Sequence, residues 1–119
     1  MAIPSGSGTE VLKYIALQGV STTTQTLITG VTDHIYTIIS VVITECANSS
    51  TEKFFLGMFD SDGSSNEHVI KHWTPITANG TFVWNDKFSF SGNKTFRVKT
   101  DSAADLDVLC TYIDQDWTT

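Results

Sequence analysis

Basic residues are scarce in this chain of 119 residues, which holds 7 Lys and Arg against 13 Asp and Glu and has a net charge of −6. No Lys or Arg follows Lys99, whereas five Asp residues do. Neutralising nucleic-acid phosphates or an anionic membrane surface requires clustered cations. The charge balance therefore disfavours direct binding to nucleic acid or membrane and leaves proteins as the expected partners.

Long apolar runs are also missing. No run approaches the roughly 18 residues of a membrane span, and the first residues lack the basic and apolar regions of a signal peptide. We therefore expect a protein made in the cytoplasm. The helix formers Ala, Glu, Lys and Leu are few, whereas the chain holds 18 Thr and 12 Ser, a composition that favours strands and turns.

Cysteine is limited to Cys46 and Cys110, each within a strand-like run. In a cytoplasmic product such cysteines are typically reduced and behave as small buried hydrophobes, so we expect both thiols in the core. One domain of this length can bury an adequate core without disulfides or metals. We assign residues 9–119 to that domain and residues 1–8, which are rich in Gly, Ser and Pro, to a flexible N-terminal arm.

The stretch from His34 to Glu45 is the longest β-rich run. Apolar side chains occupy both its odd and its even positions, so neither face is patterned for water. This predicts a strand in the middle of a sheet, covered on both sides. The domain's own core would cover one side, and a neighbouring subunit is the expected cover for the other.

Further strands are indicated on both sides of this central one. Residues 9–17 form a first strand with one wetter face, because Lys13 interrupts the odd row of apolar residues. The Thr-rich stretch 21–29 is typical of an edge strand. The remaining expected strands are 53–60, placed beside the central strand, 67–73, one or two strands over 81–100 with a turn at 91–93, and a last strand holding Leu106 to Tyr112, followed by a tail from Asp114 to Thr119.

Eight or nine short strands without a helical period predict an all-β fold, an antiparallel two-sheet β-sandwich that can take the jelly-roll form. A closed barrel is the alternative. The even-position aromatic row Phe82, Trp84, Phe88 and Phe90 could stack on sugars or bases, but at strand spacing in a small domain it is more typical of a core.

Catalytic and metal-binding patterns are not found in the sequence. His68 and His72 would lie about 13 Å apart on one strand, too far to share an ion, and the loop at 60–67 has the composition of a calcium loop without its spacing. No nucleophile elbow, P-loop or dinucleotide fingerprint occurs. We expect no enzyme, no catalytic residue, no metal and no cofactor; a hydrolase using Asp105 or Asp107 is a minor alternative.

Two sets of residues are candidates for protein contacts. The first set is expected to touch a partner: the apolar anchor of the arm, the start of the first strand, and a tryptophan that either folds back or docks on a neighbour. The second set lies on strands that are apolar on both faces and is expected at an oligomer interface. The first set is Ile3, Pro4, Val11 and Trp117, and the second is Tyr36, Ile38, Val42, Phe55 and Phe59.

Three segments carry a resemblance to a known class of proteins. They are the opening from Met1 to Lys13, the tetrapeptide His34-Ile35-Tyr36-Thr37, and the close from Tyr112 to Trp117. With them the chain resembles small virion structural proteins of tailed bacteriophages, marine ones especially, and among these the capsid decoration, or cement, proteins. The resemblance implies a homo-oligomer, a trimer, that binds the major capsid protein on the outer surface of the head and is made in the host cytoplasm.

A second class of function is compatible with the same resemblance. A head-fibre, knob or tail-tip domain would bind a host receptor or glycan through exposed loops, such as 60–66 and 74–80. Removal of residues 2–8 separates the two hypotheses, because a decoration protein should lose head binding while a receptor-binding domain should keep its host binding.

Overall fold

The fold of the described chain consists of β-strands, with no helix. A computed structural model describes residues 9–46, 51–60, 67–101 and 106–117, with the backbone alone at 67–70 and 72. No helix in these segments could cross a membrane. The strands are β1 (Thr9–Val20), β2 (Gln25–Thr29), β3 (His34–Glu45), β4 (Glu52–Asp60), β5 (Glu67–Ile76), β6 (Thr81–Trp84), β7 (Phe88–Ser91), β8 (Lys94–Thr100) and β9 (Leu106–Asp116).

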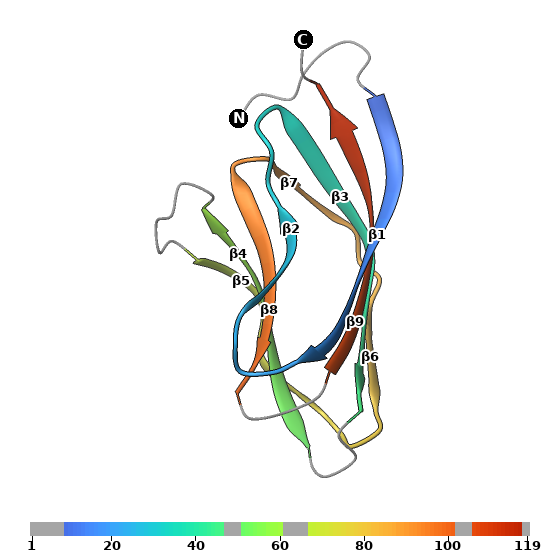
Figure 1. Ribbon diagram of the computed structural model, residues 1–119, viewed down its shortest axis with the longest axis vertical. Helices are drawn as coiled ribbons and strands as arrows, with labels where there is room; N and C mark the ends of the chain where they lie inside the picture. The colour runs from blue at the N-terminus through green and yellow to red at the C-terminus, as the bar shows by residue number, and fades with distance from the viewer. Residues whose placement is uncertain (1–8, 47–50, 61–66, 102–105, 118–119) are drawn as a thin grey trace.

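Two antiparallel sheets pack face to face, which confirms the predicted β-sandwich (Figure 1). One sheet has the order β1-β9-β3-β6, with β7 also paired to β3, and the other has the order β2-β8-β4-β5. Strands from the two ends of the chain pair in a nested series: β1 with β9, β2 with β8, β3 with β6 and β7, and β4 with β5. This nesting is the winding of a jelly roll.

β3 lies in the middle of its sheet with the bounds that the sequence predicts. It pairs with β9 along one edge and with β6 and β7 along the other. Its core-facing residues change parity, because Tyr36 and Ile38 are buried at even positions and Val41 and Ile43 at odd ones. A register shift between Ile38 and Ser40 causes the change. The bulge thus explains part of the apolar character of both rows of β3. Among the residues that the structure describes, the second sheet covers β3 on one side, and nothing covers the other side.

The prediction that the strand at 53–60 neighbours the central one is wrong. β4 lies in the opposite sheet, between β8 and β5, because the nested winding places consecutive strands β3 and β4 in different sheets. Other bounds also differ from expectation: β2 begins at Gln25, and β5 continues to Ile76. β1 continues past Gly19, which adopts a left-handed φ of 70°, as far as Val20. β9 continues through the predicted tail to Asp116, paired with both β1 and β3.

The core lies between the two sheets. Aromatic side chains of β6 and β7 pack into or against it, so the core interpretation of the row from Phe82 to Phe90 is confirmed. Cys110 is fully buried, and this burial raises its pKa to about 12. Cys46, however, is exposed just beyond the end of β3, contrary to expectation; neither cysteine forms a disulfide. The largest fully buried side chains are Phe54, Phe96, Ile38, Ile43, Leu56 and Leu106.

Two glycines allow the β7–β8 turn to touch the β2–β3 connection. The amide of Gly92 donates to the carbonyl oxygen of His34 at 2.9 Å. A Cβ on Gly92 would overlap the backbone carbonyl of Val31, and a Cβ on Gly30 would overlap the backbone carbonyls of Lys94 and Gly92. Because the obstructing atoms are backbone, a side chain at either glycine would force two segments apart.

We predict that Gly92→Ala lowers the free energy of unfolding by about 1–3 kcal/mol, the usual effect of overpacking. Equilibrium urea unfolding measures the change. Thr32→Ala, at an exposed neighbouring position, is the control and should change stability by less than about 0.5 kcal/mol. Equal stability of the two variants would contradict the close contact.

Candidate interaction surface

The outer face of the β1-β9-β3-β6 sheet exposes large apolar side chains. Leu12 is 68% exposed and Tyr14 73%, both on β1, while Val83 of β6 is 53% and Leu109 of β9 is 42% exposed. These are four of the six exposed large hydrophobic residues among the described side chains. We call this surface the apolar face; its members are Leu12, Tyr14, Ala16, Val42, Val83 and Leu109.

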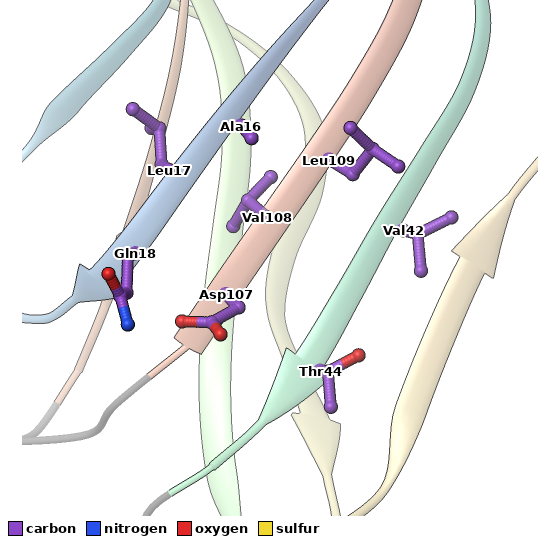
Figure 2. A pocket seen from close by; sticks show the side chains of 8 residues that line it. All are labelled: Ala16, Leu17, Gln18, Val42, Thr44, Asp107, Val108 and Leu109. Carbon is purple, nitrogen blue, oxygen red and sulfur yellow. The ribbon is translucent and has the colours of Figure 1, made fainter.

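Strand register aligns these side chains across the sheet. Ala16 pairs with Leu109, Leu109 with Val42, and Val42 with Val83, so one apolar row crosses four strands. Figure 2 shows the first three of these residues on adjacent strands. They line a shallow hollow of about 530 Å³, which is bounded by Gln18, Thr44 and Asp107 at the end of the sheet.

A second hollow continues the apolar face along β1. It has a volume of about 450 Å³, is lined by Leu12, Lys13, Tyr14 and Thr111, and shares Leu109 with the first. The two hollows therefore form one continuous surface, and the residues that line it are mostly apolar or threonine. A continuous apolar area of this kind is uncommon on a monomeric protein and marks an interaction site.

Charge is confined to the two ends of the apolar face. Glu10 accepts a hydrogen bond from Gln115 at 2.7 Å at one end, and Asp107 accepts one from the amide of Gly19 at 3.3 Å at the other. Among the described residues of β1, β9, β3 and β6 that point outward, none is Lys or Arg. The centre of the face can thus be covered without burying a charge.

Lys13 does not interrupt this face because it points inward. Its ammonium donates to Asp114 Oδ2 at 2.8 Å, and this hydrogen bond is the main reason that the pKa of Lys13 is raised. The row with Lys13 is therefore the inner one, and the row with Leu12 and Tyr14 meets solvent. The sequence predicted that the face with Lys13 would be the wetter one. This is wrong because Lys13 is paired with a carboxylate of the last strand, which local sequence does not reveal.

Asp114 is the centre of a polar network that links β1, β3 and β9. Its side chain is only 8% exposed and also contacts His34, with Nδ1 2.7 Å from Oδ1. The other ring nitrogen, Nε2, lies 3.4 Å from Asp116 Oδ1. A neutral imidazole can donate from one nitrogen only, whereas an imidazolium can serve both carboxylates. The network thus joins the ends of three strands beside the apolar face.

The predicted partner-binding residues are scattered. Ile3 and Pro4 lie outside the described residues. Val11 is 45% exposed on the edge strand β1. Trp117 is half-buried, its amide donates to the carbonyl oxygen of Asp33 at 2.9 Å, and its indole Nε1 is buried without a hydrogen-bond partner. In the single chain Trp117 therefore lies against its own domain, and its docking on a partner stays a prediction.

The predicted oligomer-interface residues fall into three environments. Tyr36 and Ile38 are 2% and 0% exposed and belong to the core, so their assignment to an interface is corrected. Phe55 and Phe59 are on the outer face of the other sheet, covered by side chains of the same chain. Only Val42 lies on the apolar face. The other members of the apolar face were not selected from the sequence. Those on β1 could have been found from the apolar residues at even positions of 9–17. Leu109 and Val83 carry no sequence signal other than being apolar.

No metal-binding arrangement is found among the described residues, in the sense of three or more His, Cys, Asp or Glu side chains that could hold an ion. His68 and Asp105, which were weighed for metal and hydrolase chemistry, have side chains outside the description.

Comparison with solved structures gives several domains of the same fold. One is a chain from the disulfide-linked pili of Bacillus endospore appendages, with a TM-score of 0.52 and 14% identity, covering 99% of this chain and 97% of that one. Another is from the capsid of Helicobacter pylori bacteriophage KHP30, with a TM-score of 0.51 and 8% identity over 92% and 90% of the two chains. No family model matches the sequence, and a search of curated proteins gives no match.

A third similar structure is a carbohydrate-binding enzyme. It is Clostridium thermocellum xylanase 10B with its CBM22-1 and GH10 modules, with a TM-score of 0.50 and 19% identity, and the match covers 92% of this chain and 25% of that one. At these identities the likenesses show the fold alone. The fold occurs in virion, pilus and carbohydrate-binding proteins, which is consistent with a structural or binding domain.

We predict that Asp114→Asn destabilises the protein by about 2–3 kcal/mol, because it removes a buried charge that accepts two charge-assisted hydrogen bonds. Urea unfolding at pH 8 measures the change, and Asp86→Asn, at an exposed position, is the control.

The same variant has a defined pH dependence. The pKa of Lys13 is raised above its ordinary 10.5, so the ion pair contributes fully below that pH and is lost as pH rises through the raised value. The difference in stability between wild type and Asp114→Asn should therefore shrink as the pH rises above 10.5. A difference that stays constant from pH 8 to 11 would contradict this.

Proposed function

We propose that this protein is a structural subunit of a tailed-phage virion, a decoration protein that binds the major capsid protein on the outer surface of the head as a homo-oligomer. The observation that carries the proposal is the apolar face, a row of apolar side chains across four strands with no cation at its centre. Such a face requires a cover. A second copy of the chain is the cover that we propose.

The area of the apolar face is adequate for such a contact. The strands β1, β9 and β3 and the edge formed together by β6 and β7 lie about 4.8 Å apart. With about eight residues in each of these four rows, at about 3.3 Å per residue, they present about 500 Å². Two such surfaces in contact bury about 1,000 Å², which is near the lower limit of specific interfaces. Sheet-on-sheet packing at about 10 Å, with the strands of the two sheets roughly aligned, is an established way to bury two flat apolar sheet faces.

Association through small faces suits the task of a decoration protein. A subunit that reinforces a shell binds it through many weak contacts. When several copies are linked in an oligomer, their combined avidity exceeds the affinity of each contact. Two copies joined through the same face form a dimer, which would present two identical attachment sites to the shell. In the trimer that the resemblance implies, the apolar face of each copy would instead contact a different surface of the next copy.

Two independent lines support the virion assignment. The segments Met1–Lys13 and Tyr112–Trp117 resemble those of small virion proteins of tailed phages. The jelly-roll winding is shared with a phage capsid chain. The apolar face adds a physical reason for self-association, and a structural role needs no catalytic group or cofactor.

We predict that Leu109→Asp dissociates the oligomer, since it places a charge at the junction of the two hollows, where a truncated hot spot weakens association by about 30-fold or more. Sedimentation equilibrium gives the mass. The fold should persist because Leu109 is 42% exposed in the single chain. Val31→Asp is the matched control, since Val31 is 50% exposed on the β2–β3 connection, away from the apolar face. A monomeric wild type, or an unchanged mass in Leu109→Asp, would contradict the proposed interface.

Quantitative mass spectrometry of purified virions tests the proposed location on the head surface. A decoration protein that covers the shell follows its symmetry, so we expect about one copy per major capsid protein. A ratio lower by about a hundredfold would contradict the proposal and indicate a vertex, neck or tail protein, with binding to a host receptor or glycan as its function.

A further inference from the structure

The outer face of the other sheet, β2-β8-β4-β5, concentrates positive charge. Lys53 of β4 and Arg97 and Lys99 of β8 all point outward, on the side opposite to the core residues Phe54 and Leu56. They are three of the seven basic residues in a chain of net charge −6. We call this surface, made of Lys53, Phe55, Phe59, Trp73, Arg97 and Lys99, the basic face.

Aromatic rings support two of these cations. The guanidinium carbon of Arg97 lies 4.6 Å from the centre of the Phe59 ring. The ammonium of Lys99 lies 5.1 Å from the ring centre of Phe55 and 5.7 Å from that of Trp73. Strand register pairs Arg97 with Gly57, whose lack of a side chain leaves room for the guanidinium. The cations are thus held flat against the sheet in defined positions.

Among the side chains that the structure describes, carboxylates do not neutralise this group. Elsewhere the lysines Lys13 and Lys94 pair with Asp114 and Asp60. Among the described side chains no acid forms an ion pair with Lys53, Arg97 or Lys99, and Arg97 Nε is buried without a hydrogen-bond partner. Asp101, which follows β8, accepts from the backbone amide of Lys53 at 3.3 Å. The basic face therefore holds oriented donors whose anionic partner is not supplied by this part of the chain.

We propose that the basic face binds an extended acidic segment of another protein, with carboxylates at alternate positions. Arg97 and Lys99 are two residues apart on one strand, a separation of about 6.6 Å, and an extended acidic peptide repeats its carboxylates at the same interval. Guanidinium and carboxylate groups also match in geometry, since they can form two parallel hydrogen bonds.

Other ligand classes fit less well. Sugar stacking requires a bare ring face, whereas Lys99 covers Phe55, which is 3% exposed, and Arg97 covers Phe59. Nucleic acid is disfavoured because three cations on an acidic protein neutralise few phosphates. The basic face lies on the opposite side of the sandwich from the apolar face, so both can be occupied together, and the inference does not depend on the proposed function.

The test measures binding of a fluorescein-labelled peptide of alternating Glu and Thr to the full chain, by fluorescence anisotropy at low ionic strength. We expect saturable binding that weakens as salt is added. The double variant Arg97→Gln, Lys99→Gln should weaken it by about tenfold or more, because two charge-assisted contacts are lost. Lys87→Gln removes one positive charge at an exposed position between β6 and β7 and should leave binding unchanged.

A substitute variant and further measurements complete the test and distinguish an acidic peptide from other ligands. If the double variant fails to fold, as judged by circular dichroism, Lys53→Gln replaces it, because that side chain is exposed; it should weaken binding by about threefold or more. No binding of the peptide, equal weakening by Lys87→Gln, or tighter binding of a sulfated oligosaccharide than of the peptide would overturn the proposal. A change in oligomeric mass caused by the double variant would also overturn it, because the occupant would then be another copy of this chain.

Discussion

The pairing of β3 with β9 is the constraint on which the rest of the structure depends. It returns the last strand to the longest β-rich stretch, over a register that runs from His34 opposite Asp116 to Glu45 opposite Leu106. Side chains on the inner side of this pair, such as Ile43 and Val108, are buried against the second sheet. Because adjacent strands alternate in step, their outward neighbours Val42 and Leu109 align as well. Burial on one side of the sheet thus creates the apolar row on the other.

The same pairing separates charge from that row. β9 brings Asp114 beneath β1, where it binds Lys13, so the only cation that β1 carries is turned inward. The opposite sheet keeps Arg97 and Lys99 outward, over aromatic rings. The two outer faces therefore differ in chemistry, with one suited to an apolar cover and the other to carboxylates. A small β domain with two such faces is suited to bridging neighbours in an assembly.

Sequence patterns predicted much of this architecture. The bounds of β3, the edge position of β2 and the core role of the aromatic row near Phe82–Phe90 follow from local alternation and propensity. The assignment of Tyr36 and Ile38 to an oligomer interface was wrong, because a bulge after Ile38 switches which row of β3 faces the core. The position of β4 was wrong because the nested winding, a nonlocal property, places it in the other sheet.

Composition and a two-residue period, which depend only on neighbouring residues, determined the fold class and the acidic balance. Tertiary structure decided which of two apolar rows became core and which remained at the surface. A period of two separates a strand into two faces but does not say which one meets the second sheet. That choice depends on partners distant in the chain, such as Asp114 for Lys13 and Leu109 for Val42.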